Sequence, residues 1–398
     1  MENDLLNAPD ITINSSRIIS GIKAGLIKTR INIRILKLAI EVYKNPVKAY
    51  KILRQLIIRI DKVQGKIKNL RYVESDNKYY WSVDYPAWPS PTFDMYIKNE
   101  FNRIGSNEKV HKSLQTIIFA ITNRCSLQCK HCFEWDKLDN VDKLSLEELK
   151  TVLNKILAQG IRHIQLSGGE PLVRFDDMIE LIKSADSETN FWILTSGFGL
   201  TSEKAATLKK AGLTGVNISL DHWNHTFHND FRNNNNSFKW VKDAVKNCKE
   251  NGIIVSLSLC ATKEFISIDN LTKYLELAKE WKVDFIRILE PRNVGRFINN
   301  DAEIDSAQQK ILEEFYIYIN SDKKYREYPL LNYPGYHQRK VGCFGAGNRY
   351  LYIDSNADFH ACPFCLQKQG NALTDSFNDA ILKMKEKKCH AFKMNYND

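Results

Sequence analysis

The sequence predicts an α/β protein built around a parallel sheet. Between residues 113 and 300, six short segments alternate with helical stretches, and each segment is too apolar to have a solvated face. This alternation favours a partial (β/α)6 barrel, similar to a TIM barrel, or a doubly wound sheet. In both cases the chemistry is expected at the carboxyl ends of the strands. The six segments read TIIFAIT, RHIQLSG, NFWILTS, GVNISLD, IIVSLSLC and DFIRILEP.

The helices between these strands are expected from capping and periodicity. Ser145 and Glu148 form a capping-box pattern that opens a helix running to Gly160. The alternation stops after about residue 300, where a helix, a Tyr-rich segment, a cysteine-containing segment and a last Lys-rich helix are expected. The other helices are expected over 176–186, 202–211, 237–250, 268–280 and 305–320.

The N-terminal segment is expected to be helical and basic. Residues 17–69 are typical of helices, with a break at Asn45 and Pro46, which suit an N-cap and a first helical position. The net charge of the 398-residue chain is +10, and the stretch from Ile11 to Leu70 alone carries +12. The next stretch, LRYVESDNKYYWSVDYPAWPSP, predicts a small hairpin with a turn at SDNK, followed by a Pro-rich connection.

We therefore expect three parts: a basic helical extension with an aromatic hairpin (1–112), a core barrel (113–300) and a small cysteine-rich domain (301–398). The start, MENDLLNAPDITINSS, lacks the basic and apolar regions of a secretory signal, and no run approaches the length of a membrane span. A cytoplasmic protein is expected, and in such a protein clustered cysteines are expected to bind metal or an iron–sulfur cluster rather than form disulfides.

Three cysteines lie together just past the first predicted strand, in TNRCSLQCKHCFEW. Cys125, Cys129 and Cys132 can converge on one side of a wrapped loop, and soft thiolates suit a cubane iron–sulfur cluster. A structural zinc site is the alternative, but it needs a fourth protein ligand, and His131 is poorly placed to fold back between two cysteines. Three ligands to a four-iron cluster leave one iron open for a small molecule.

The Cys-x3-Cys-x2-Cys loop after the first strand resembles the signature of the radical S-adenosylmethionine (radical SAM) enzymes. The stretch LSGGEP at the second strand resembles the Gly-Gly-Glu-Pro motif of that family. The resemblance covers roughly residues 113–300 and implies that the three cysteines hold a [4Fe–4S] cluster whose open iron binds S-adenosylmethionine. One electron then releases methionine and a 5′-deoxyadenosyl radical, which abstracts a hydrogen atom from a substrate.

The resemblance also implies which residues bind S-adenosylmethionine. Glu170 would hold the amino group of the methionine moiety, while Gly168 and Gly169 let the backbone approach the ligand closely. His131 stands at a position that is usually aromatic in the family and whose backbone contacts the adenine. The other expected contacts come from the motif, from the ends of the next strands and from the loop beyond them: Pro171, Ser196, Ser219, Asp221 and Arg232.

A second group of cysteines lies in GCFGAG, in IDSNADFHACPFC and in the last helix. These stretches resemble the auxiliary-cluster extension, of twitch or SPASM type, that many radical SAM enzymes carry at the C-terminus, and IDSNADFHAC looks like a hairpin. Four cysteines suffice for one auxiliary cluster, and a structural zinc ion is the alternative. The four are Cys343, Cys362, Cys365 and Cys389.

The stretch DHWNHTFHNDFR after the fourth strand places three histidines at intervals of three, which is one pattern for a metal site: His222, His225 and His228. Similar enzymes have a polar loop with a histidine and an arginine here, and His228 with Arg232 fits that pattern. Cys248 and Cys260 are expected to be buried thiols without a metal.

The resemblance implies an enzyme that receives electrons from an external donor such as flavodoxin or ferredoxin. Enzymes with this C-terminal extension often modify ribosomally made peptides, so a peptide is the first expected substrate. The basic N-terminal helices favour instead a lipid or glycolipid, reached by peripheral contact with the inner membrane surface, although such charges are often a solvated face. A non-catalytic iron–sulfur regulator is a third interpretation. Nucleic acid is not expected, because the basic stretch has little aromatic interleaving.

Overall fold

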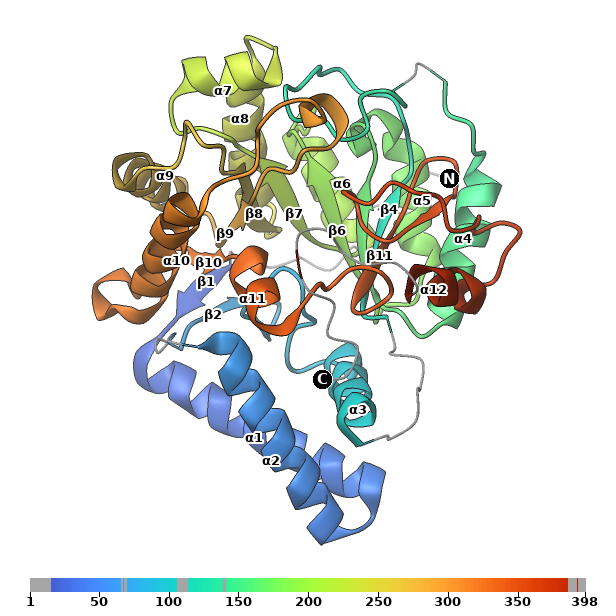
Figure 1. Cartoon of the computed structure of the whole chain (residues 1–398), viewed down its shortest axis with the longest axis vertical. Helices are drawn as coiled ribbons and strands as arrows, with labels where there is room; N and C mark the ends of the chain where they lie inside the picture. Colours follow the sequence, from blue (N-terminus) through green and yellow to red (C-terminus); the bar gives the residue numbers. More distant parts are fainter. Residues whose placement is uncertain are drawn as a thin grey trace, which may run out of the picture.

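The protein is represented by a computed structural model that describes residues 16–65, 67, 70–105, 114–138, 141–385 and 392. Its centre is a nine-stranded sheet with the order β10-β9-β8-β7-β6-β5-β4-β11-β12 (Figure 1). The six predicted strands are confirmed as consecutive parallel neighbours, which form a partial (β/α)6 barrel. They are β4 (Thr116–Ala120), β5 (His163–Ser167), β6 (Asn190–Thr195), β7 (Leu213–Ser219), β8 (Ile254–Cys260) and β9 (Phe285–Leu289).

Helices follow the strands and cover the outer face of the barrel (Figure 1). Side chains such as Ile164, Ile193 and Val216 point from the strands into this helical layer and are fully buried. The Ser145–Glu148 capping box is present, and Asp305 with Gln308 forms a second one. The helices of this series are α4 (Leu146–Ala158), η1 (Pro171–Arg174), α5 (Phe175–Ser184), α6 (Ser202–Ala211), α7 (His225–Arg232), α8 (Ser237–Glu250), α9 (Ile268–Glu280) and α10 (Ser306–Ser321).

The C-terminal part extends the same sheet at both ends. Strand β10 (Leu330–Asn332) runs parallel to β9, and β11 (Tyr350–Ile353) runs parallel to β4. Strand β12 (Phe359–His360) returns antiparallel to β11, which confirms the hairpin expected before Cys362. The remaining elements are η2 (Gly295–Phe297), η3 (Lys323–Tyr325), α11 (Pro334–Val341) and α12 (Phe377–Lys385). Cys389 lies outside the described residues.

The N-terminal part contains the predicted helices α1 (Gly21–Tyr43) and α2 (Pro46–Gln64). The Asn45 side chain accepts a hydrogen bond from the backbone N–H of Lys48 at 3.1 Å, so the predicted N-cap is confirmed. The two helices fold back against each other rather than lying in line, so their basic residues do not form one straight stripe (Figure 1). Within the described residues, none of the helices combines the length and the apolarity that crossing a membrane requires.

The predicted aromatic hairpin is confirmed as β2 (Tyr72–Ser75) and β3 (Lys78–Tyr80), with β1 (Arg17–Ile19) alongside. The Pro-rich connection follows the hairpin and ends at Pro91, where no helix was predicted. A helix, α3 (Pro91–Gly105), begins there because the Ser90 hydroxyl accepts from the backbone N–H of Phe93 at 3.0 Å. Proline at a first helical position has no N–H bond to lose.

The hairpin region closes the amino-terminal end of the barrel. Apolar side chains from this region pack against the inward-facing residues at the start of three barrel strands and of β10. This plug separates the amino-terminal end of the barrel from the cavity that lies above it. Its buried members are Val73, Tyr80, Val83, Ala87, Trp192, Ile254, Phe285 and Leu330.

Candidate active site

The cysteine loop after β4 is held against the end of β5 by backbone hydrogen bonds. The N–H groups of Gly169 and Glu170 donate to the carbonyl oxygens of Thr122 and Arg124 at 2.9 and 2.8 Å. A Cβ at Gly168 would overlap the Thr122 carbonyl oxygen, and one at Gly169 would overlap that of Arg124. The two glycines are therefore required first by close packing against the loop that carries the cysteines.

The three cysteines of this loop all line one large cavity, with Cys129 buried and the other two partly exposed. Burial raises the pKa of Cys125 to about 12 and that of Cys132 to about 11. Iron ions would compensate the buried thiolates, because a coordinated thiol is deprotonated by the metal's charge. Three soft ligands on one loop, all facing the cavity, fit an iron–sulfur cluster that keeps one iron open.

Glu170 is buried at the end of β5, and its carboxylate is fixed from several sides. One oxygen accepts from the Thr195 hydroxyl at 2.7 Å and from the Leu172 N–H at 3.1 Å. The other accepts from the N–H and the hydroxyl of Ser196 at 2.8 and 2.5 Å. Burial raises the pKa of Glu170, although these four donors act in the opposite direction. The carboxylate borders the cavity and is suitably placed to receive a cationic group.

Asp221 and Arg232 form a buried ion pair beyond the end of β7. The Arg232 Nε donates to Asp221 Oδ2 at 2.6 Å, and its Nη1 donates to the Cys129 Sγ at 3.5 Å. Burial alone would raise the pKa of Asp221, but the Arg232 charge outweighs it and holds that pKa below its usual value. The pair therefore links the cysteine loop to the barrel strand.

His131 stacks on Phe231 of α7, with ring centroids 4.9 Å apart. Burial lowers the pKa of His131 to about 4, so the ring is neutral at pH 7, and its Nδ1 has no hydrogen-bond partner within the described ranges. The backbone N–H of Lys130 donates to the Phe231 carbonyl at 3.0 Å. Helix α7 thus holds the middle of the cysteine loop.

The cavity has a volume of about 910 Å³ and runs from the cysteine loop through the barrel interior to α1 and α2. The predicted S-adenosylmethionine contacts line it, with one exception. Pro171 does not; it is buried as the first residue of η1. The predicted residues brought to the cavity are Cys125, Cys129, His131, Cys132, Gly168, Gly169, Glu170, Ser196, Ser219, Asp221 and Arg232.

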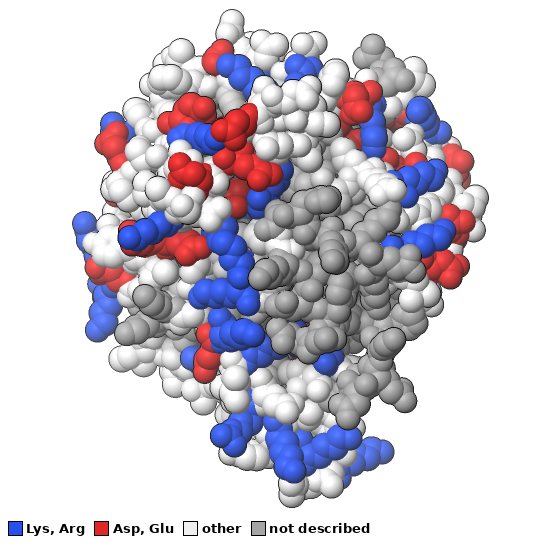
Figure 2. Space-filling model, viewed as in Figure 1, with Lys and Arg blue, Asp and Glu red and all other residues white. Residues whose placement is uncertain are grey.

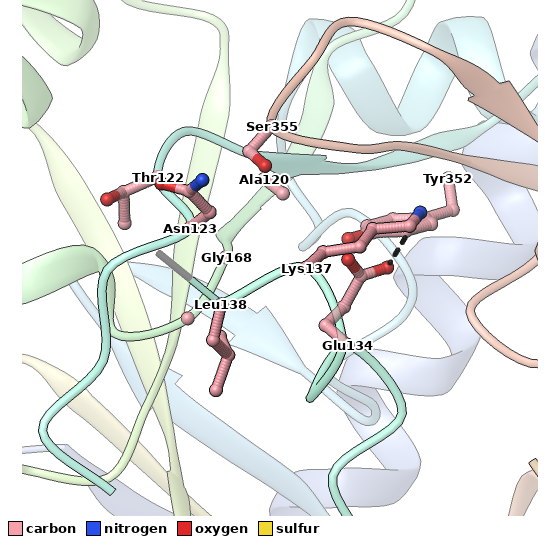
Figure 3. A pocket seen from close by; sticks show the side chains of 10 residues that line it. Ala120, Thr122, Asn123, Glu134, Lys137, Leu138, Gly168, Tyr352 and Ser355 are labelled. Atoms are coloured by element: carbon pink, nitrogen blue, oxygen red, sulfur yellow. Dashed lines mark ion pairs between the residues drawn. The ribbon is translucent and has the colours of Figure 1, made fainter. Parts of the chain in front are cut away.

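Two supports of the cysteine loop were not predicted from the sequence. The Arg296 N–H donates to the Cys132 carbonyl at 3.1 Å, and a Cβ at Gly295 would overlap that carbonyl. Figure 3 shows a narrow recess where Glu134 and Lys137 face each other beside Tyr352 of β11. The Lys137 ammonium also lies 3.0 Å from Asp354, so the loop is tied to the C-terminal part of the sheet.

Three of the four C-terminal cysteines lie close together. The Cys362 thiol is hydrogen-bonded with that of Cys365, and Cys343 is near enough to interact with it electrostatically. The bond to Cys365, together with burial, raises the pKa of Cys362. A Cβ at Gly345 would lie 3.6 Å from the Cys343 Sγ and 3.1 Å from the Cys362 Cβ, so the site is tightly enclosed.

The three histidines after β7 are not brought together. His228 is buried and accepts from the Asp221 N–H at 3.1 Å, His222 stacks on Phe227, and His225 is exposed. In the part of the chain that the structure describes, no group of three or more His, Cys, Asp or Glu side chains is placed to hold a metal ion. The thiolates of a cubane cluster bind separate irons and need not converge on one ion.

Comparison with known proteins agrees with this geometry. Residues 119–278 match the model of the Radical SAM superfamily. Among curated proteins, the chain is 29% identical over 198 residues to the Fe-coproporphyrin III synthase of Methanosarcina barkeri, covering 49% of each chain. It is 26% identical over 269 residues to the mycofactocin maturase MftC of Mycolicibacterium smegmatis, covering 65% of this chain and 67% of MftC. The chain thus spans about half the length of the first relative and two thirds of the second.

The fold also matches solved structures. Streptococcus suis SuiB, in a crystal structure bound to its precursor peptide SuiA, superposes with a TM-score of 0.56 at 17% identity, over 84% of this chain and 78% of that one. The matched family region contains the cysteine loop, the Gly-Gly-Glu-Pro motif and the Asp221–Arg232 pair. Residues 119–278 of this chain are therefore identified as a radical SAM domain.

Proposed function

We propose that this protein is a radical SAM enzyme in which Cys125, Cys129 and Cys132 hold the [4Fe–4S] cluster. The observation that carries the proposal is the convergence of this triad, Glu170 and Arg232 on one cavity. When bound, the cluster and S-adenosylmethionine supply a 5′-deoxyadenosyl radical that abstracts a hydrogen atom from the substrate. The chain's own residues hold the loop, receive the cofactor's polar groups and enclose the reaction.

Two of the proposed cofactor contacts, those of Glu170 and His131, are supported by observations of their surroundings. The Glu170 carboxylate would accept from the ammonium of the methionine moiety, since its oxygens are held in position by Thr195 and Ser196. The backbone of His131 would contact the adenine, and the His131 Nδ1, which has no hydrogen-bond partner among the described residues, could bond to the same ring. Ser219, at the end of β7, would bond to the ribose or carboxylate.

We propose further that the C-terminal cysteines hold one auxiliary iron–sulfur cluster. The grouping of Cys343, Cys362 and Cys365 supports this, and Cys389 would be the fourth ligand. Phe344 and Phe364, which neighbour these cysteines in sequence, line the large cavity, so an auxiliary cluster would stand close to a bound substrate. An external donor such as flavodoxin or ferredoxin would supply electrons in the cytoplasm.

A ribosomally made peptide is the first proposed substrate. Two relatives support it, since MftC is named a maturase and SuiB was crystallised with a precursor peptide. A cavity of about 910 Å³ is also larger than S-adenosylmethionine alone requires and falls within the range of sites for sizeable ligands.

The experiment is anaerobic reconstitution with iron and sulfide, followed by reduction, addition of S-adenosylmethionine and measurement of 5′-deoxyadenosine. We expect about eight irons per chain, the sum of two four-iron clusters, and 5′-deoxyadenosine that is lost when the triad is changed to alanine. Cys248→Ala is the matched control, because Cys248 is buried in α8 away from the cavity. Zinc in place of iron at the triad would overturn the proposal, and a loaded cluster that never yields 5′-deoxyadenosine would favour a regulator.

A second candidate substrate is a lipid or glycolipid at an anionic membrane surface, and one observation favours it. Helices α1 and α2 carry ten of the eighteen large apolar side chains that are exposed among the described residues. On α1 they follow a single stripe opposite the buried face: Ile22, Leu26, Ile33, Leu36 and Ile40. Figure 2 shows Lys and Arg gathered over the same end of the molecule. Such a surface is typical of peripheral binding to anionic lipids.

Flotation with vesicles tests this candidate. The protein is expected to float with vesicles that contain phosphatidylglycerol and not with pure phosphatidylcholine. Changing Ile33, Leu36 and Ile40 together to serine should abolish flotation. The control changes three exposed apolar residues elsewhere, Val141, Ile268 and Leu382, to serine. Equal flotation of both triple variants, or none by the wild type, would leave the peptide as the only candidate.

A further inference from the structure

One inner layer of the barrel is polar. Gln165, Asn217 and Arg287 point inward from the alternate strands β5, β7 and β9 and line the large cavity. In a tilted barrel, inward-facing residues of alternate strands share a layer. The strand pairing agrees with a shared layer. Gln165 lies opposite Trp192, and Trp192 lies opposite Gly215, two residues before Asn217. In the same way Asn217 lies opposite Ser256, and Ser256 lies opposite Phe285, two residues before Arg287.

Each of the three side chains of this layer has one buried polar atom without a partner among the described residues. Gln165 is 1% exposed and Asn217 is 3% exposed. The Gln165 Oε1, the Asn217 Oδ1 and the Arg287 Nε have no hydrogen-bond partner among the described residues. Leaving a buried polar group without a hydrogen-bond partner destabilises the folded state. Barrel interiors are usually filled with branched apolar side chains, so three such groups in one layer indicate that something binds them.

Asp84, from the segment after the aromatic hairpin, sets the charge of the layer. Its Oδ1 lies 2.9 Å from the Arg287 Nη2 and accepts from the Gln165 Nε2 at 3.4 Å. The carboxylate and the guanidinium therefore neutralise each other, and the layer has no net charge. Below it lies the apolar plug that includes Trp192 and Phe285. The polar layer is the floor of the cavity.

The floor faces the proposed cofactor site along the same strands. Two residues after Gln165 and Asn217 come Ser167 and Ser219, which also line the cavity. Since a strand rises about 3.3 Å per residue, this next layer lies roughly 6–7 Å closer to Glu170. A substrate group on the floor would leave the rest of the molecule directed toward the cysteine loop.

We propose that the Gln165–Asn217–Arg287 layer is a substrate-binding site for a neutral amide group. This rests on the proposed function, because it assigns the floor of the same cavity to the substrate. Side-chain amides donate and accept, so an amide ligand can satisfy them in both directions. A carboxylate would compete with Asp84 for Arg287 and be repelled by it. An ammonium group would compete with Arg287 for Asp84.

The test measures binding of small probes to the full-length, cluster-loaded enzyme without reductant. The probes are N-acetyl-L-alaninamide, which is neutral, and its carboxylate counterpart N-acetyl-L-alanine. Ligand-observed NMR titrations should give the amide a Kd at least about tenfold lower than the carboxylate. Asn217→Leu and Gln165→Met should abolish the preference. Leu194→Met on β6, which also lines the cavity, is the control that should retain it.

A second measurement guards against variants that merely misfold. Without probe, Asn217→Leu and Gln165→Met should unfold at the same or a higher temperature than the wild type, because each removes an unsatisfied acceptor. Carboxylate binding as tight as amide binding, unchanged binding by the variants, or no saturable binding of either probe would overturn the inference. Cleavage of S-adenosylmethionine, measured on the same preparations, reports separately on the proposed function.

Discussion

Arg232 places its Nη1 3.5 Å from the Sγ of Cys129, and both side chains are buried. A neighbouring cation stabilises a thiolate, which is the form that binds iron. The same guanidinium is paired with Asp221, so one side chain joins the proposed cluster ligand to the end of β7. Arg232 thus supports the cysteine loop, while its expected contact with the cofactor stays a prediction.

Replacing Arg232 with methionine should both destabilise the fold and lower iron occupancy. The change leaves Asp221 as an unpaired buried charge, and breaking such a pair costs about 3–5 kcal/mol. Urea unfolding and iron analysis of the anaerobic protein measure the two effects. The double variant Arg232→Met with Asp221→Asn should recover much of the stability but not the iron. Unchanged iron in the single variant would contradict the supporting role.

The penalty of Arg232→Met should shrink as the pH falls. In the wild type the pKa of Asp221 is below its ordinary value of 3.8, so the pair's contribution is present above that pH and is lost on further acidification. In the variant, burial without a partner raises the pKa of the same group, and protonation removes its buried charge. Unfolding free energies of both proteins, compared from neutral pH down to about pH 4, should converge. A constant difference would show that lost packing, not charge, causes the effect.

Gly169→Ala should disturb the cysteine loop more than its single methyl group suggests. The new Cβ would overlap the Arg124 carbonyl, which also accepts a hydrogen bond from the Glu170 N–H. The backbone hydrogen bonds between the cysteine loop and the Gly-Gly-Glu-Pro motif must therefore lengthen or break. We expect loss of the triad's four irons and of 5′-deoxyadenosine formation, measured after reconstitution. Gly25→Ala in α1, where a Cβ meets nothing within 4 Å, should leave both unchanged. Normal iron in Gly169→Ala would show that the loop tolerates the shift.

The barrel could be predicted because its signals are local. All six strands and the Ser145 and Asn45 caps follow from short stretches of apolar or capping residues. Helix α3 was missed because YPAWPSP is typical of a loop, while the decisive Ser90 cap is a single residue. Strand β10 was missed because it is short and pairs only with the distant strand β9. The hairpin of β11 and β12 was expected, but the pairing of β11 with the distant strand β4 was not.

In the site, too, the local motifs could be predicted from the sequence and the contacts between distant segments could not. The cysteine spacing and the Gly-Gly-Glu-Pro motif are contiguous, so the sequence predicts them together. The contact of Gly295 with the Cys132 carbonyl joins residues far apart in the chain, and an isolated glycine carries no sign of it. The polar floor is equally hidden, because Gln165, Asn217 and Arg287 stand singly within apolar strands and only the barrel register unites them.

Glu170→Gln should weaken binding of S-adenosylmethionine about 10- to 100-fold, since a hydrogen bond to a charged group contributes about 1.5–3 kcal/mol. The carboxylate is already oriented by Thr195 and Ser196, so its negative charge is what remains to offer an ammonium group. Equilibrium dialysis of the cluster-loaded, unreduced enzyme measures the affinity. Glu148→Gln, in the exposed capping box of α4, is the matched control and should bind as the wild type does. Equal affinity of Glu170→Gln and the wild type, at equal iron content, would mean that Glu170 only stabilises the turn after β5 and does not bind S-adenosylmethionine.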